Sequence, residues 1–191
     1  MKYDISTKLF GPLILADLTQ DLTPGGEMEK WDFIHGFEHY LVGDLGHIQN
    51  YDTGRYLSLT LNNYGDLRAT LVGNDGMKVT RSVRLLVAEA FVPGRTETFN
   101  AVINLDGIKT NCRANNLAWR PNWHAWKFAH QFRRDYPTRF YNVPIRNVQT
   151  GSIYSNTIEC ATTEGCVFSE IWKSIFNGVK VFPDGAVYER L

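Results

Sequence analysis

The sequence predicts an α+β fold built from small modules along its 191 residues. From Trp31 to Thr80, short apolar runs alternate with polar residues and are separated by glycines, a pattern typical of a small antiparallel sheet. Helical spacing of apolar residues follows at Ser82–Phe91, and a strand, loop, strand and helix come next, within Ala101–Arg134. After Pro137 the composition changes again, to a hairpin followed by two short helices.

The first 80 residues divide into an arm and a module. Residues 1–30 show no sustained periodicity and end in a turn-rich run, so we expect an N-terminal arm. Residues 31–80 should form a small antiparallel module. The pair Asp75 and Gly76 is a favourable hairpin turn inside it.

Residues 81–136 are expected to form a ββα core preceded by a helix. Apolar residues recur at helical spacing in the first segment, and Pro93 with Gly94 should end that helix. The expected elements, in order, are a helix over Ser82–Phe91, strands over Ala101–Leu105 and Asn116–Trp119, and a helix within Pro121–Arg134.

Residues 137–191 are expected to form a C-terminal module with a β-hairpin and a pair of helices. Thr150 and Gly151 mark the turn of the hairpin, and Gly165 separates the helices. The expected elements are strands over Val143–Val148 and Ser152–Tyr154, helices over Thr157–Glu164 and Ser169–Phe176 with Ser169 as N-cap, and a final strand over Ala186–Leu191.

Charge is distributed unevenly along the chain, although 20 Lys and Arg balance 20 Asp and Glu. Residues 1–50 carry 3 basic and 8 acidic groups, whereas residues 101–150 carry 8 basic and 2 acidic groups. A polyanion such as nucleic acid should therefore meet residues 101–150.

The cysteines and the hydropathy pattern exclude several other classes of protein. Cys112, Cys160 and Cys166 are too few for a disulfide framework and lack zinc-ligand spacing, so we expect three small buried residues in a reducing cytoplasm. No apolar run approaches the length of a membrane span, and we expect neither export nor membrane attachment.

Three passages resemble, in order, the modules of phage and intron-encoded HNH homing endonucleases, over about residues 30–185. Trp31–Ile48 is similar to the nuclease-associated N-terminal motif. Val83–Pro93 together with Ile103–Trp119 is similar to the HNH core, and Val143–Val181 resembles the C-terminal helix-turn-helix-like module. The core positions that match are Asp106, Gly107, Lys109, Asn111, Asn116, Leu117 and Trp119.

The positions that carry catalysis in this family are replaced in this chain. The general base, a His in active members, falls at Asn104, and an amide cannot accept the proton of an attacking water. The two metal-ligand positions fall at Ile103 and Ala125, whose side chains cannot hold a divalent cation. The resemblance therefore implies a degenerate catalytic site, with Asn104 and Asn116 as its remnants and with no cofactor.

The resemblance and the basic residues together predict the DNA-binding surface. On the last helix of the core, basic side chains should point outward, while Trp123, Trp126 and either His130 or Phe132 form the buried stripe. In the C-terminal module a recognition helix would present polar residues to DNA, although a small packing or dimerisation domain is nearly as compatible. The predicted DNA contacts are Arg84, Lys109, Arg113, Arg120, Lys127, Arg133, Arg134, Lys173 and Lys180.

Three functions remain open from the sequence. We favour a phage-encoded, catalytically inactive protein that binds double-stranded DNA in the host cytoplasm. An active nickase would need a shifted set such as Asn104, Asn116 and His124 with one Mg²⁺, whereas we expect His124 and His130 on the helix face, reaching phosphates or solvent. The third possibility is an inhibitor that binds a host protein through its acidic first 50 residues. The sequence does not predict the oligomeric state.

Overall fold

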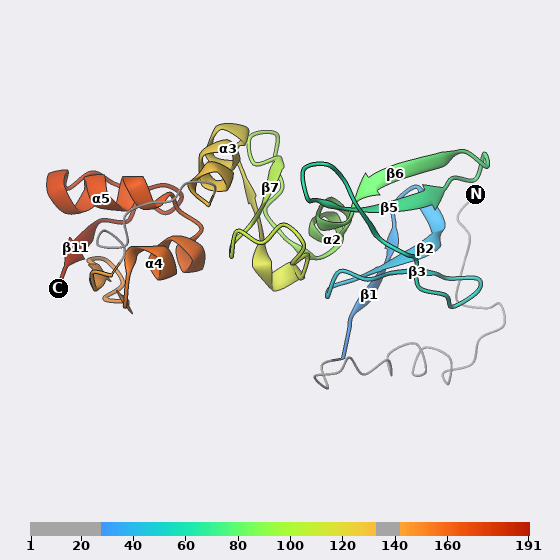
Figure 1. The fold of residues 1–191 in the computed structure, drawn as a ribbon, viewed down its shortest axis with the longest axis horizontal. Coiled ribbons are helices and arrows are strands. Elements are labelled where there is room, and N and C mark those ends of the chain that lie inside the picture. The colour runs from blue at the N-terminus through green and yellow to red at the C-terminus, as the bar shows by residue number, and fades with distance from the viewer. Residues whose placement is uncertain (1–27, 133–141) are drawn as a thin grey trace.

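The computed structural model describes residues 28–132 and 142–191, and it confirms an α+β fold in which every strand pair of these ranges is antiparallel. Three groups of elements follow one another along the long axis of the molecule (Figure 1). The first module lies at one end, the ββα core in the middle and the C-terminal module at the other end.

The first module contains two three-stranded sheets rather than the single small sheet that we expected. The first sheet has the order β1 (Trp31–Ile34), β2 (Phe37–Gly43), β3 (Ile48–Asn50). The second has the order β4 (Thr60–Leu61), β5 (Leu67–Val72), β6 (Lys78–Ser82). The predicted turn at Asp75 and Gly76 connects β5 with β6 and places Gly76 at φ +75°.

Helix α2 (Val83–Phe91) confirms the helix predicted after the sheets. Its buried residues are Val83, Leu86, Val87 and Ala88. They belong to one hydrophobic cluster that runs from Ile34 to Trp119 and joins residues of both sheets with residues of the core. The boundary expected near residue 80 therefore falls within a continuous apolar cluster.

The ββα core has the predicted elements in the predicted order. β7 (Ala101–Asn104) pairs with β8 (Leu117–Arg120), with Asn104 opposite Leu117, and a short 3₁₀ turn, η2 (Ala114–Asn116), precedes β8. Helix α3 (Asn122–Gln131) follows and contacts β7.

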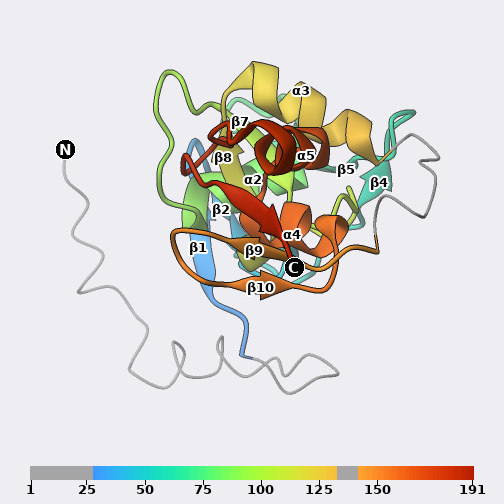
Figure 2. The same ribbon diagram turned by 90° about the vertical axis from the view of Figure 1, so that its left-hand side faces the viewer.

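The C-terminal module has its own hydrophobic cluster, which includes Ile145, Ile171 and Tyr188. Its sheet has the order β10 (Ile153–Tyr154), β9 (Ile145–Asn147), β11 (Tyr188–Arg190). Helices α4 (Thr157–Glu164) and α5 (Phe168–Asn177) pack together beside this sheet (Figure 2).

The ends of these two helices show one correct and one wrong prediction. Asn156 caps α4, since its Oδ1 accepts a hydrogen bond from Glu159 N at 2.8 Å, and Gly165 ends α4 as predicted, at φ +65°. The prediction of Ser169 as the N-cap of α5 is wrong, because the helix begins at Phe168 after Val167.

All three cysteines are buried, as expected. None of the helices in residues 28–132 and 142–191 is long and apolar enough to span a membrane.

Candidate functional site

A hydrogen-bonded loop between β7 and β8 shapes the region that corresponds to the HNH core. Asp106 Oδ1 accepts bonds from Ile108 N at 2.8 Å and from Asn116 Nδ2 at 2.9 Å, while its Oδ2 accepts from Asn111 Nδ2 at 2.7 Å. Gly107 follows at φ +74°, a left-handed conformation that favours glycine. This loop therefore uses the matching Asp, Gly and Asn residues for its own structure.

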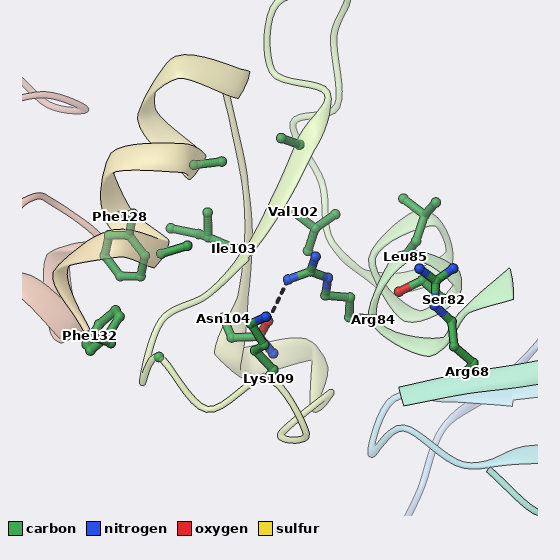
Figure 3. Close-up of a pocket in the computed structure, with 14 residues that line it drawn as sticks. Arg68, Ser82, Arg84, Leu85, Val102, Ile103, Asn104, Lys109, Phe128 and Phe132 are labelled. Atoms are coloured by element: carbon green, nitrogen blue, oxygen red, sulfur yellow. Dashed lines mark hydrogen bonds between the residues drawn. The ribbon is translucent and has the colours of Figure 1, made fainter. Parts of the chain in front are cut away.

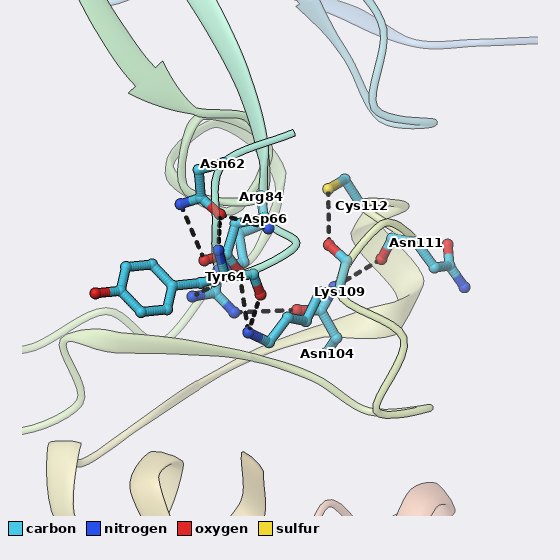
Figure 4. A network of polar contacts seen from close by, with 8 residues as sticks. All are labelled: Asn62, Tyr64, Asp66, Arg84, Asn104, Lys109, Asn111 and Cys112. Atoms are coloured by element: carbon cyan, nitrogen blue, oxygen red, sulfur yellow. Dashed lines mark hydrogen bonds and ion pairs between the residues drawn. The ribbon is translucent and has the colours of Figure 1, made fainter. Parts of the chain in front are cut away.

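Asn104 and Asn116, the predicted remnants of the catalytic site, meet at the same carbonyl of this loop. Asn104 Nδ2 and Asn116 Nδ2 both donate to Asn111 O, at 2.8 and 2.9 Å. Asn104 is buried, and its Oδ1 accepts from Arg84 Nη1 at 3.3 Å (Figure 4). Both amides are thus committed to holding the loop.

A cavity of about 410 Å³ opens where Asn104 ends β7 (Figure 3). The positions that correspond to the metal ligands, Ile103 and Ala125, lie in its wall. Among the described residues of the lining, the only side-chain oxygens are the neutral ones of Ser82 and Asn104. No group of three His, Cys, Asp or Glu residues in the described part of the chain could hold a metal ion. The described lining residues therefore do not fit the divalent cation that the resemblance implies.

The same cavity is rich in positive charge. Arg84 Nη2 lies 3.6 Å from Asp66 Oδ1, and Lys109 Nζ lies 4.0 Å from the same oxygen and donates to Tyr64 O at 2.5 Å (Figure 4). Arg68 is the third cation of the lining, and no carboxylate lines the cavity among residues 28–132 and 142–191. The lining residues are Arg68, Ser82, Arg84, Leu85, Ala101, Val102, Ile103, Asn104, Gly107, Lys109, Ala125, Phe128, Ala129 and Phe132.

Cys112 lies beside this network but is not prepared as a nucleophile. The side chain is buried, and burial raises the pKa of its thiol to about 11. Its Sγ contacts Lys109 O at 3.8 Å. The thiol is therefore protonated at neutral pH and packs as a small core residue.

His124 lies away from this cavity, contrary to our expectation of a surface position. Its side chain is fully buried, and its Nε2 lies 2.9 Å from Gly165 O of the C-terminal module. The ring packs against Phe182, with centroids 4.7 Å apart. Burial lowers the pKa of His124 below its ordinary value, which keeps the imidazole neutral. The structure thus does not bring His124 together with Asn104 and Asn116.

Arg120 also lies at this junction rather than on an open surface. Its Nη1 donates to Trp119 O at 2.9 Å, its Nε is buried, and burial lowers the pKa of the guanidinium. A Cβ built on Gly165 would lie 2.8 Å from Arg120 Nη2, which shows how closely the two modules approach there. This position suits a role in joining the modules better than a DNA contact.

Helix α3 buries a different stripe from the one that we predicted. Its buried residues are His124, Phe128 and Gln131, whereas Trp123 and Trp126 are 50% and 64% exposed. The prediction of a buried tryptophan stripe is therefore wrong: the junction with the C-terminal module requires burial on the opposite side of the helix. Sequence periodicity could not show this, because both faces carry large rings.

The exposed face of α3 combines aromatic and basic groups. Lys127 Nζ lies 5.2 Å from the centroid of the Trp123 ring and 3.1 Å from Glu170 Oε1. The rings of Trp126 and His130 lie 4.0 Å apart, and His130 Nδ1 contacts Trp126 O at 2.8 Å.

The other predicted DNA contacts are distributed over the molecule. Arg113, Lys173 and Lys180 are exposed, while Arg133 and Arg134 lie outside the described residues. Sequence analysis missed Arg68 and Ser82 in the cavity. Their only signal was their position on two adjacent strands that the hairpin at Gly76 pairs.

Comparisons with known proteins show what this chain is similar to. Residues 29–72 match the model of the NUMOD4 motif. Two uncharacterized HNH endonucleases of Acanthamoeba polyphaga mimivirus are 32% identical over 102 residues and 33% identical over 90 residues. These matches cover 53% and 47% of this chain, but the chain spans only 25% and 26% of the length of these relatives.

A solved structure of DNA binding and cleavage by the HNH homing endonuclease I-HmuI is 21% identical, with a TM-score of 0.49. The alignment covers 85% of this chain and 98% of that one. The two curated relatives come from a giant virus, so the expected bacteriophage origin stays a prediction.

Proposed function

We propose that this chain, an HNH-homing-endonuclease-type protein with an N-terminal NUMOD4 motif, binds double-stranded DNA without cleaving it. One observation supports the proposal above the others. The cavity at the HNH core is lined by Ile103, Asn104 and Ala125 where the family needs a metal ligand, a general base and a second metal ligand. Three cations occupy its wall in place of acidic or imidazole groups.

Ile103, Asn104 and Ala125 supply neither a general base nor a metal ligand for phosphodiester hydrolysis. Removal of a general base alone costs about 10²- to 10⁴-fold in rate, and loss of the metal removes the Lewis acid that would stabilise the leaving group. Asn104 cannot substitute, because its amide group is hydrogen-bonded to Arg84 and to Asn111 O.

The chain does present the cationic groups that DNA binding requires. Positive charge lines the cavity, and further exposed cations lie elsewhere on the core and the C-terminal module, at Arg113, Lys127 and Lys173. Exposed Trp123 and Trp126 accompany them on α3. Cations of this kind bind the phosphate backbone without regard to sequence.

The test combines plasmid cleavage and gel shift on the same purified protein, with and without Mg²⁺ or Mn²⁺. We expect a shift of duplex DNA that weakens steeply with salt, and no nicked or linear product. The double variant Ile103→Asn, Asn104→His serves as a restoration control, since it returns a ligand and a base to the cavity. Metal-dependent nicking by the parent protein that disappears in Asn104→Ala would contradict the proposal.

The alternative of an active nickase is less well supported, because it needs His124 near Asn104. The imidazole instead contacts Gly165 O and Phe182. A protein partner would be favoured by the opposite result of the gel shift, namely no DNA binding at any salt concentration.

A further inference from the structure

Two polar groups in the cavity lack the partners that buried groups normally have. Arg68 on β5 and Ser82 at the end of β6 are cross-strand neighbours. Arg68 Nε and Ser82 Oγ are both buried and have no hydrogen-bond partner among the described residues. Buried donors are rarely left unsatisfied, so two adjacent ones in the wall of a cavity point to a missing acceptor.

Two further cations of the lining supply more donors. Arg84 and Lys109 line the same cavity, and Figure 3 shows Arg84 reaching toward Asn104, with Lys109 beside it. Asp66 lies close to both cations, at 3.6 and 4.0 Å, but it is not part of the lining. Among the described residues, one nearby carboxylate and three lining cations leave an excess of positive charge at the cavity.

The remaining wall is apolar and excludes water from one side. Ile103 and Phe128 are buried, and Ala125 lies beside them. An anion in such a place interacts more strongly with the cations than it would in bulk water, because the local dielectric constant is lower.

We propose that this cavity holds one phosphodiester group of the DNA, bound by Arg68, Ser82, Arg84 and Lys109 and not hydrolysed. A phosphate offers several acceptor oxygens, and guanidinium groups donate to them in a matching planar geometry. The former catalytic cavity thereby becomes a phosphate clamp, to which the first module contributes Arg68 and Ser82. This inference rests on the proposed function and names the group that the site binds.

The test compares Arg68→Met with Lys78→Met in the full chain. Both variants remove one positive charge from the same pair of strands, but Lys78 is exposed and does not line the cavity. Fluorescence anisotropy with a duplex of mixed sequence gives Kd as a function of salt. We expect Arg68→Met to weaken binding about tenfold and to reduce the slope of log Kd against log salt by about one, whereas Lys78→Met leaves both nearly unchanged.

Inorganic phosphate supplies a second readout that does not involve DNA. At matched ionic strength, phosphate should raise the Tm of the parent protein and of Lys78→Met above the value in chloride, and this rise should be absent in Arg68→Met. Ser82→Ala, a milder change, should weaken duplex binding about threefold and covers the case in which Arg68→Met does not fold.

The possible outcomes separate the inference from the proposed function. If the parent binds duplex DNA and neither Arg68→Met nor Ser82→Ala changes Kd or the salt slope, the clamp is overturned and DNA binding stands. If the parent does not bind duplex DNA at all, the proposed function is overturned and the phosphodiester assignment with it.

Discussion

At the scale of single residues, the polar side chains between β7 and β8 that match the HNH pattern serve the structure of the loop. Asp106, Asn111 and Asn116 bond to one another, and Asn104 joins them through Asn111 O. Each of these side chains forms hydrogen bonds within the loop, so few of its polar groups are available to bind a metal ion or to transfer a proton. The polar lining of the cavity beside the loop includes Arg68 and Ser82, which are not among the residues that match the HNH pattern.

Asn104→Ala tests the structural role of this amide. The substitution removes the bond to Asn111 O and the acceptor of Arg84 Nη1, so we expect the free energy of unfolding to fall by about 1–3 kcal/mol. Urea denaturation measures the change. Asn115→Ala, at an exposed position of the same loop, is the matched control and should change stability by less than about 0.5 kcal/mol. Equal effects of the two substitutions would exclude a special role for Asn104.

His124 predicts a pH dependence of stability. Burial lowers its pKa in the folded state below the ordinary value of about 6.5, although the bond to Gly165 O opposes this shift. The unfolded chain therefore binds the proton more readily than the folded chain. The stability that neutral His124 contributes is complete above about pH 6.5 and is lost as the pH falls toward the lower pKa of the folded state.

Thermal or urea unfolding between pH 7.5 and 5 measures this dependence. His124→Gln keeps a donor for Gly165 O but does not titrate, so its stability should decrease less over the same range than that of the parent. Parallel curves for the two proteins would show that His124 is not the source.

At the scale of elements, α3 joins the two hydrophobic clusters. It contacts β7 of the core, while Gln131 Oε1 accepts a bond from Phe168 N of the C-terminal module at 3.0 Å. Lys127 adds an ion pair with Glu170 at 3.1 Å, which contributes little because the lysine is half exposed. Because α3 packs between the core and the C-terminal module, it buries His124, Phe128 and Gln131 rather than the tryptophans that its hydrophobic pattern indicates.

The glycines that end α4 and α5 allow a measurement of how tightly the core and the C-terminal module pack at their junction. Gly165 and Gly178 both end a helix at φ +65°, but a Cβ at Gly178 would meet nothing within 4 Å. At Gly165 a Cβ would lie 2.8 Å from both Arg120 Nη2 and Leu105 Cδ2. We expect Gly178→Ala to cost about 1–2 kcal/mol from backbone strain, and Gly165→Ala about 1–3 kcal/mol more from crowding. Denaturant unfolding of the two variants gives the difference, and equal costs would show that the junction yields without strain.

At the scale of the whole molecule, charge and shape favour a DNA ligand rather than a metal-dependent reaction. The chain is neutral as a whole, yet its cations gather in the core between the two end modules. The net charge of zero is therefore a poorer guide to the ligand of this protein than the positions of its charged residues.

The absence of a metal-ligand group from the described residues predicts a melting temperature that does not respond to Mg²⁺ or Mn²⁺ at millimolar concentrations. A site whose Kd lay a hundredfold below the cation concentration would add about 2.7 kcal/mol to the stability of the folded state. Differential scanning fluorimetry with and without EDTA checks this. An increase of several degrees in the melting temperature of the parent protein on addition of Mg²⁺ or Mn²⁺ would favour the active nickase instead.

Much of the fold could be read from local patterns. The helix at α2, the order of β7, β8 and α3, and the bounds of α4 follow from apolar spacing and from turn and cap residues, which act within a few positions along the chain. The unfavourable chemistry at two positions could be read in the same way, since residue type alone decides that the side chains of Ile103 and Ala125 cannot bind a metal ion.

Only the tertiary structure decided which face of α3 is buried, how the cavity is lined and where His124 and Arg120 lie. These features depend on contacts between segments far apart in the chain, such as His124 with Gly165. Local periodicity carries no information about such partners, because burial is set by the surface that packs against a residue and not by the residue itself. The sequence by itself therefore determined the elements and the residue types at the positions of interest, and the packing of the modules determined which of these residues line the cavity.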